Sequence, residues 1–372
     1  MKTVAVFGST GSIGVQTLNV LRRFPHEYKV TALVAGGNVG LLRKQAEEFM
    51  PDFAGCIAET RLPAGVRGFF GKDAALRVAE VADADIAVMA ISGLDALAPL
   101  EECIKHGKRI ALANKEAIVC AGELVLGNAT KYGAEIIPVD SEHSAVFQCL
   151  KTGERSDVKR IILTASGGPF YSKDIDLSSV TPEQAVKHPT WNMGAKISVD
   201  SATMVNKGLE IIEAGRLFST YAVDYVIHPE SIIHSMVEFE DNSTVALMSY
   251  PSMELAIQYA LGYPYRYAND GVRPFDFSVP LTFGRPDEVR FPAPATARRC
   301  LLEGGAAPAI FSIADEIAVD MFLKKKIRFT DITGIIEEAL CINETKRVES
   351  AEQLYALRDS LIKQIGAFLD RK

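Results

Sequence analysis

Short apolar runs alternate with helical segments over about the first 140 residues of this 372-residue chain. The apolar runs cover residues 4–7, 30–35, 86–91, 109–112 and 135–139. Their length and spacing predict buried strands joined by helices. Strands that alternate with helices in this way form a parallel, doubly wound sheet, an α/β architecture. Ligands bind such a sheet at the carboxyl ends of its strands, where Gly8, Gly36, Ser92 and Asn114 fall.

A glycine-rich turn follows the first predicted strand. It reads Gly8-Ser-Thr-Gly-Ser-Ile-Gly14 and precedes a helical segment that begins at Val15. Glycines at such a turn let backbone N–H groups approach a pyrophosphate at a helix N-terminus. The spacing differs from the Gly-x-Gly-x-x-Gly of dinucleotide folds, so the flanking strand and helix support the prediction. The second strand runs into Gly36-Gly37-Asn38 without the acidic residue that binds an NAD ribose, which favours NADP(H).

Composition excludes several classes of partner. The chain has 47 acidic and 40 basic residues, a net charge of −7, and no basic tract. Nucleic acid and anionic membranes are therefore not expected as partners. No apolar run reaches transmembrane length and no signal pattern is present. The six cysteines form no Cys-x-x-Cys pair, so we expect a reduced, cytoplasmic protein without zinc.

The rest of the chain predicts three further parts. Residues 1–140 would form the Rossmann-like domain, 141–262 an α+β catalytic domain, 263–293 an irregular connector, and 294–372 a C-terminal helical bundle. The expected elements are a strand at 160–165, a hairpin of 232–239 and 245–249, and helices at 295–302, 308–323, 331–340 and 350–369. Thr181-Pro-Glu-Gln184 and Ser350-Ala-Glu-Gln353 have the form of capping boxes.

Candidate binding groups gather in the block from His188 to Glu210. A helix from Ser201 to Gly215 would place Asn206, Lys207 and Glu210 on roughly one face. Ser201 would then lie near its N-terminus, where free N–H groups favour a phosphate. The alternative is an amphipathic helix with a solvated polar face.

Two carboxylates follow the strand that ends at Val139. In extended chain Asp140 and Glu142 point to the same side, and Glu210 would complete an oxygen-rich cage. Such a cage suits Mg²⁺ or Mn²⁺ better than zinc. The alternative is that Asp140 or Ser141 simply begins the next helix as its N-cap.

Several motifs together carry a resemblance to a known family. They are Gly8 to Gly14, Ala113-Asn-Lys-Glu116, Pro138-Val-Asp-Ser-Glu-His-Ser144, Ala165-Ser-Gly-Gly-Pro-Phe170, the His188–Glu210 block and His228-Pro-Glu-Ser-Ile-Ile-His-Ser-Met236. Across most of its length the chain resembles the 1-deoxy-D-xylulose-5-phosphate reductoisomerase family. The resemblance implies conversion of 1-deoxy-D-xylulose 5-phosphate to 2-C-methyl-D-erythritol 4-phosphate with NADPH and Mg²⁺ or Mn²⁺. It also implies the non-mevalonate route to isopentenyl diphosphate and a homodimer.

The resemblance assigns roles to individual residues. It implies metal ligands at Asp140, Glu142 and Glu210, and catalytic residues at Lys115, Glu142, His188 and Glu210. The implied substrate contacts are Lys115, Ser141, Glu142, Ser166, His188, Trp191, Ser201, Asn206, Lys207 and Glu210. The implied cofactor contacts are Gly8, Thr10, Gly11, Ser12, Ile13, Gly36, Gly37, Asn38, Asn114, Glu116 and Gly194.

Trp191 is the only tryptophan in the chain. With Met193 it matches the lid of the family, and an aromatic on a loop can cover a substrate and exclude water. The alternative for Trp191 is a place in a core, and for His188 the end of a helix.

The chain departs from the family pattern at two places. Gly37 stands where many relatives carry a basic residue that could meet a 2′-phosphate, so NADP preference depends on Asn38 and the hydroxyls of Ser9, Thr10 and Ser12. The segment Ser312-Ile-Ala-Asp-Glu316 differs from the Asn-rich run that is usual there.

Two other functions stay open at this point. A scaffold that lost catalysis would have no use for three carboxylates and a lysine in matching positions. A simple NADP-dependent dehydrogenase of phosphorylated aldehydes would not need a metal. A chelator therefore separates these alternatives, whereas the sequence leaves open both the physiological metal and the choice between an α-ketol shift and a retro-aldol route.

Overall fold

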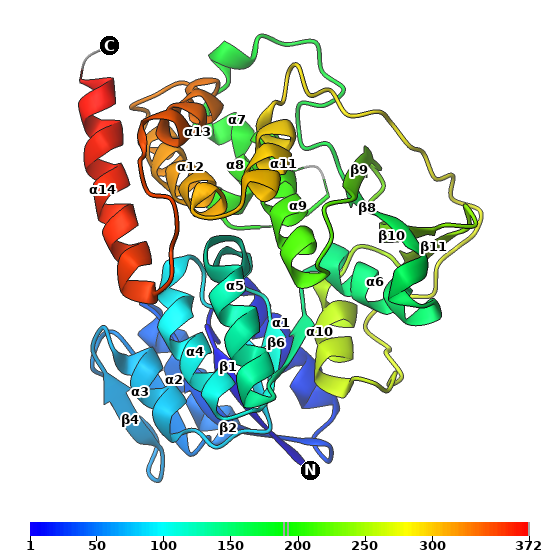
Figure 1. The fold of residues 1–372 in the computed structure, drawn as a ribbon. Coiled ribbons are helices and arrows are strands. Elements are labelled where there is room, and N and C mark those ends of the chain that lie inside the picture. The colour runs from blue at the N-terminus through cyan, green and yellow to red at the C-terminus, as the bar shows by residue number, and fades with distance from the viewer. Residues whose placement is uncertain (189, 192, 371–372) are drawn as a thin grey trace. The chain divides into compact units, whose positions relative to one another are not determined.

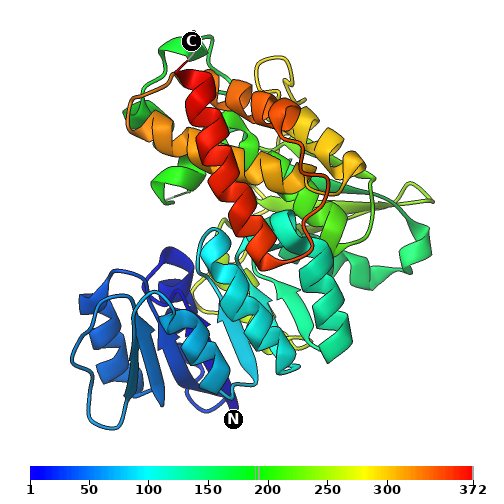
Figure 2. The ribbon, with the colours of Figure 1, turned by 60° about the vertical axis from the view of Figure 1, so that its left-hand side comes forward.

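The computed structural model describes residues 1–188, 190–191 and 193–370. Contacts between these residues define two units. Figures 1 and 2 show the ribbon coloured by residue number from the N-terminus to the C-terminus. The first unit comprises Met1–Ala117, Val125–Phe147 and Ser252–Arg273, and the second comprises Ile118–Leu124, Gln148–Pro251 and Pro274–Lys372. The predicted functional division at residues 140, 262 and 293 stays a prediction.

A seven-stranded parallel sheet forms the centre of the first unit. Its order is β4-β3-β2-β1-β5-β6-β7. The strands are β1 (Lys2–Phe7), β2 (Tyr28–Val34), β3 (Phe53–Cys56), β4 (Arg67–Phe70), β5 (Ile86–Met89), β6 (Arg109–Leu112) and β7 (Glu135–Pro138). The predicted doubly wound sheet is confirmed. The strands β3 and β4 were not predicted, because each has only four residues and includes a glycine.

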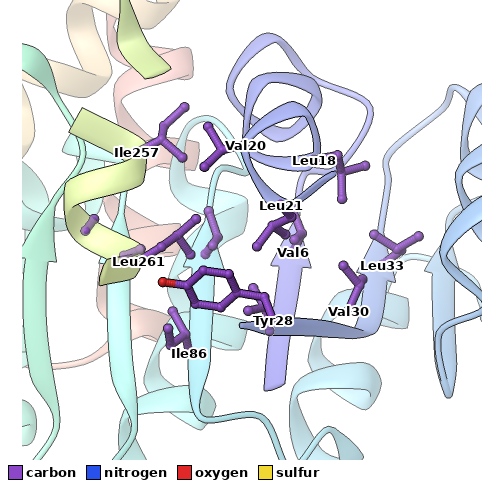
Figure 3. Close-up of a cluster of buried hydrophobic side chains, with 14 of the residues drawn as sticks. Val6, Leu18, Val20, Leu21, Tyr28, Val30, Leu33, Ile86, Ile257 and Leu261 are labelled. Atoms are coloured by element: carbon purple, nitrogen blue, oxygen red, sulfur yellow. The ribbon is translucent and has the colours of Figure 1, made fainter. Parts of the chain in front are cut away.

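Helices accompany these strands. They are α1 (Ser12–Arg23), α2 (Val39–Phe49), α3 (Ala74–Val81), α4 (Leu97–Lys105), α5 (Lys115–Tyr132) and α6 (Ser141–Cys149), followed much later by α10 (Met253–Gly262). Figure 3 shows Ile257 and Leu261 of α10 beside Val20 and Tyr28 in the core of the unit. Burying an aliphatic side chain of this size stabilises a fold by about 1.5–3 kcal/mol. This burial explains why α10 returns to the first unit although it follows the second sheet in sequence.

The second unit contains a four-stranded mixed sheet in the order β11-β10-β8-β9. The strands are β8 (Val158–Ala165), β9 (Val223–Ile227), β10 (Ile233–Phe239) and β11 (Thr244–Met248). The predicted hairpin of β10 and β11 is confirmed. Its turn has Asn242 at φ 64°, and Asp241 accepts a hydrogen bond from the Ser243 N–H. The strand β9 was not predicted.

The helices of the second unit are α7 (Pro182–Ala185), α8 (Ala195–Thr203), α9 (Val205–Leu217), α11 (Ala293–Glu303), α12 (Ala307–Leu323), α13 (Asp331–Ile342) and α14 (Ala351–Leu369). The Thr181/Gln184 capping box is confirmed, and Ser350 caps α14. The described residues between 263 and 292 form no helix or strand beyond a single bridge of Gly284 to Ile227. Among the described helices, none combines the length and apolarity that crossing a membrane requires.

The expected single helix from Ser201 to Gly215 is wrong. Met204 adopts a left-handed conformation with φ 62°, which ends α8 at Thr203 and begins α9 at Val205. A left-handed residue cannot continue a right-handed helix, so the chain changes direction there. Sequence periodicity could not detect this break, because methionine is a good helix former.

Candidate active site

The glycine loop between β1 and α1 requires glycine at two positions. Gly8 has φ +88°, and a Cβ there would lie 2.4 Å from the carbonyl oxygen of Ala90. A Cβ at Gly14 would lie 2.2 Å from the carbonyl oxygen of Gly8. The loop lies between β1 and β5, where the strand order reverses, which is the ligand-binding position of a doubly wound sheet. Gly11 and Ser12 are exposed at the start of α1.

The end of β2 is exposed as well. Gly36, Gly37 and Asn38 are all solvent-accessible, and the Asn38 side chain accepts a hydrogen bond from Leu41 N–H at 3.2 Å, capping α2. No carboxylate occupies these positions, as the preference for NADP(H) requires.

Asn114 joins two loops at the carboxyl edge of the sheet. Its side chain caps α5 by accepting from Ala117 N–H at 2.8 Å, and it donates to the carbonyl oxygens of Ile91 (2.9 Å) and Gly93 (3.0 Å). Glu116 accepts from the same amide at 3.0 Å. Asn114 is only 2% exposed, so its observed contacts shape the loop after β5. The cofactor contacts predicted for Asn114 and Glu116 stay predictions.

The carboxylates after β7 lie at the start of α6. Asp140 accepts from Glu142 N–H at 3.2 Å, so the N-cap alternative is confirmed and the extended geometry is wrong. The Lys115 ammonium lies 3.2 Å from the other Asp140 oxygen, and His143 Nδ1 lies 3.0 Å from Asp140. Ser141 Oγ donates to Glu142 at 2.5 Å. Capping does not exclude metal binding, because a carboxylate has about four lone-pair sites.

The polar face of α9 is buried. Lys207 donates to Glu210 and to the carbonyl oxygen of Thr164, and Asn206 also donates to Glu210. Their predicted common face is confirmed. The solvated-face alternative is wrong, because Lys207 and Glu210 are 3% and 1% exposed. Removing the cation from a buried carboxylate costs free energy, because the remaining charge is then buried without a partner. The pair of Lys207 and Glu210 is therefore a specific arrangement.

Ser201 lies in the last turn of α8, so its predicted place at a helix N-terminus is wrong. The loop after β8 approaches it closely instead. A Cβ at Gly168 would lie 2.6 Å from the Ser201 carbonyl oxygen, and Gly168 has φ +67°. Ser201 and the Ser166–Gly168 loop are therefore neighbours despite the changed helix boundary.

His188 connects Ser166 to the loop that carries Trp191. Its Nδ1 accepts from the backbone N–H groups of Thr190 (3.1 Å) and Trp191 (2.9 Å), while Nε2 lies 3.0 Å from Ser166 Oγ. An Nδ1 that accepts two hydrogen bonds carries no proton, so the proton lies on Nε2 and is donated to Ser166. Burial lowers the pKa of His188. Trp191 is only partly buried, so its core alternative is wrong.

Three family models match the chain. They describe 1-deoxy-D-xylulose 5-phosphate reductoisomerase over residues 4–122, its C-terminal domain over residues 136–218, and a DXP reductoisomerase C-terminal domain over residues 248–363. The 1-deoxy-D-xylulose 5-phosphate reductoisomerase of Caldanaerobacter subterraneus subsp. tengcongensis is 46% identical over 352 residues, 91% of this chain and 92% of the relative. The chain belongs to the 1-deoxy-D-xylulose 5-phosphate reductoisomerase family.

Other members of the reductoisomerase family agree. The relative from Geotalea uraniireducens is 45% identical over 95% of each chain. The solved reductoisomerase of Zymomonas mobilis in complex with NADPH has a TM-score of 0.91 at 39% identity and covers 99% of both chains. A DOX-P reductoisomerase complex with NADPH, fosmidomycin and magnesium has a TM-score of 0.92 at 35% identity, with 100% and 98% coverage.

Sequence reasoning missed three residues that the reductoisomerase fold places at these groups. His143 lies against Asp140, the Thr164 carbonyl accepts from Lys207, and Gly168 approaches Ser201. His143 could have been found from its position three residues after Asp140 on a helix. The backbone contacts of Thr164 and Gly168 leave no signal in residue type.

Proposed function

We propose that this enzyme converts 1-deoxy-D-xylulose 5-phosphate to 2-C-methyl-D-erythritol 4-phosphate by isomerisation and NADPH-dependent reduction. This reaction belongs to the non-mevalonate route to isopentenyl diphosphate. One observation supports the proposal most directly: in this chain of the reductoisomerase family, Glu210 on α9 is buried and paired with a cation. Asn206 and Lys207, the residues predicted to bind the substrate phosphate, lie beside it. A scaffold without catalysis has no need for this costly arrangement.

The residues fit a hard divalent metal. Asp140, Glu142 and Glu210 offer only carboxylate oxygens, which suit Mg²⁺ or Mn²⁺. Glu210 is 1% exposed and already paired with a cation, as expected for a carboxylate that needs positive charge nearby. A bound divalent metal would polarise the substrate carbonyl and favour loss of the hydroxyl proton.

The glycine loop fits the pyrophosphate of NADPH, which supplies the hydride. Gly8, Thr10, Gly11, Ser12 and Ile13 would form this site. Gly36, Gly37 and Asn38 would lie at the adenosine ribose, where no carboxylate repels a 2′-phosphate. Asn114, Glu116 and Gly194 would complete the cofactor contacts.

The substrate phosphate would bind Ser166, Ser201, Asn206 and Lys207. Ser166 Oγ accepts from Gly168 N–H at 3.2 Å and from His188, so its own proton is directed toward a further acceptor such as a phosphate oxygen. Lys115 would stabilise negative charge that develops on the substrate oxygen. Ser141 would contact the substrate, and Trp191 and Met193 would cover it.

We also propose a homodimer in the cytoplasm, following the family resemblance. Sedimentation equilibrium of the purified chain tests the dimer: one species of twice the chain mass is expected, and a monomer at micromolar concentration would contradict it.

The reaction is tested by NADPH oxidation with 1-deoxy-D-xylulose 5-phosphate, with product identification by mass spectrometry. We expect turnover with Mg²⁺ or Mn²⁺, no turnover in the presence of a chelator, and slower turnover with NADH than with NADPH. Turnover that survives a chelator, or that needs only a phosphorylated aldehyde, would favour the simple dehydrogenase. Lys207→Ala should weaken binding of the phosphorylated substrate far more than binding of an unphosphorylated analogue, because a hydrogen bond to a charged group contributes about 1.5–3 kcal/mol.

A further inference from the structure

The glycine loop contains a four-residue turn whose central peptide group joins Ser9 to Thr10. The Gly11 N–H donates to the Gly8 carbonyl oxygen at 3.0 Å and closes this turn. A trans peptide group is planar, so its C=O and its N–H point in opposite directions. Whatever fixes the direction of the Ser9 carbonyl therefore also fixes the direction of the Thr10 N–H.

The Ser9 carbonyl is held by a glutamine of the second helix. Gln45 Nε2 in α2 donates to the Ser9 carbonyl oxygen at 2.8 Å, and this bond is buried. The Ser9 N–H donates to the carbonyl oxygen of Val34 at 2.8 Å, so both backbone groups of Ser9 have partners. Because Gln45 fixes the carbonyl on the side of α2, the Thr10 N–H points away from α2. Thr10 is partly exposed, whereas Ser9 is fully buried.

The Gln45 side chain contributes little to the stability of the fold. It is only 4% exposed, and among the residues that the structure describes its Oε1 atom has no hydrogen-bond partner. A buried amide oxygen without a donor destabilises a folded protein. This cost offsets much of the gain from the Nε2 bond, so stability does not explain why a glutamine lies beneath the loop.

We propose that Gln45 is a positioning residue for the cofactor: its side-chain N–H sets the orientation of the Ser9–Thr10 peptide group, so that the Thr10 N–H is directed at the pyrophosphate of NADPH. The inference rests on the role of the glycine loop in the proposed function. It adds a residue of α2, outside the loop, that acts through the backbone without touching the cofactor. A donor whose direction the protein already fixes loses less entropy when a ligand binds.

Gln45→Met tests this proposal, because it keeps an unbranched, helix-forming side chain and removes the donor. We expect the dissociation constant for NADPH, measured by fluorescence titration, to rise about tenfold, because the Ser9–Thr10 peptide group is no longer held. The kcat at saturating NADPH should stay near that of the wild type. Adenosine 2′-monophosphate, which has no pyrophosphate, should bind the variant and the wild type equally. The free energy of unfolding should change little, because the variant also removes the unpaired Oε1.

Gln258→Met is the matched control. Gln258 in α10 is 6% exposed, and its Nε2 also donates to a backbone carbonyl oxygen, that of Tyr267, at 2.8 Å. Its Oε1 accepts from the Asn269 side chain at 2.8 Å, so both ends of this amide are paired. The control variant should therefore lower the free energy of unfolding, measured by urea denaturation, and leave NADPH affinity unchanged.

Wild-type NADPH affinity in Gln45→Met would overturn the proposal. An equal loss of affinity for adenosine 2′-monophosphate would overturn it too, because Gln45 would then act through the whole of α2. If Gln45→Met does not fold, Gln45→Glu decides in the same way, since an ionised carboxylate has no proton to donate. A wild-type chain that does not bind NADPH would contradict the cofactor site of the proposed function itself, so the two failures are distinguishable.

Discussion

The two ring nitrogens of His188 have different partners, and this difference fixes its protonation. Two backbone N–H groups point at Nδ1, and Ser166 Oγ lies at Nε2. Protonation would put a second proton on Nδ1 and break both backbone bonds. The neutral imidazole therefore orients Ser166 and the backbone at Trp191. This role is narrower than proton transfer, which the predicted catalytic role of His188 would suggest.

We predict that His188 titrates below an exposed histidine, because burial lowers its pKa. The unfolded state then binds the proton first as pH falls, so stability is present above about pH 6.5, the usual histidine value, and is partly lost as pH falls through it. NMR titration of the histidine Cε1–H signals measures the midpoint. The signal that is absent from the His188→Gln variant is the signal of His188. A midpoint at or above that of a histidine in a model peptide would contradict the neutral ring.

Asn114 and Asn38 are both asparagine N-caps, but only Asn114 is buried and bonded to a second loop. Loss of a cap costs about 0.5–2 kcal/mol, and unsatisfied buried acceptors add about 1–3 kcal/mol. Asn114→Ala should therefore lower the free energy of unfolding clearly more than Asn38→Ala, as measured by urea denaturation. Equal losses in the two variants would show that the bonds to Ile91 and Gly93 contribute nothing.

At the scale of elements, helices were easier to predict than strands. Period and caps located α11 to α14 to within about two residues, because long helices repeat their signal over several turns. The strands β3, β4 and β9 are short and their apolar residues are interrupted by a glycine or an aspartate, whereas the equally short β5, which was predicted, is apolar throughout. The break at Met204 was invisible because it depends on one backbone angle, which tertiary packing imposes.

The glycine loop gives a prediction at this scale. Gly8→Ala places a Cβ against the Ala90 carbonyl at a left-handed φ, so the loop has to move. We expect NADPH affinity to fall at least tenfold and stability to fall by about 1–3 kcal/mol. Fluorescence titration of NADPH and urea denaturation measure the two effects.

Gly40→Ala is its control, because a Cβ there meets nothing within 4 Å and Gly40 lies in α2. Alanine should leave NADPH affinity unchanged and slightly stabilise the helix. An unaltered NADPH affinity in Gly8→Ala would show that the glycine loop is not part of the cofactor site.

At the scale of the whole molecule, the sequence predicted the parallel sheet, the family and the groups at the carboxyl edge. It could not predict the division into contact units, because α10 joins the first unit through Ile257 and Leu261 across more than 200 residues of chain. It also predicted that Asp140 and Glu142 share an extended strand end, whereas Glu142 lies in the first turn of α6. Side-chain geometry depends on where a helix begins, and that boundary is the least certain part of a pattern.

We propose that Asp140, Glu142 and Glu210 hold one divalent metal, and a variant of Glu210 tests this proposal most directly. Glu210→Gln removes one ligand charge and leaves the glycine loop untouched. We measure Mn²⁺ binding by electron paramagnetic resonance, turnover of 1-deoxy-D-xylulose 5-phosphate and NADPH affinity. The control is Glu238→Gln, because Glu238 on β10 is a carboxylate paired with Lys159 and Arg160 of β8 and is not one of the three proposed ligands. We predict weakened Mn²⁺ binding, turnover lowered well beyond ~100-fold and unchanged NADPH affinity. Wild-type Mn²⁺ affinity and near-normal turnover in Glu210→Gln would show that Glu210 is not a ligand of the metal.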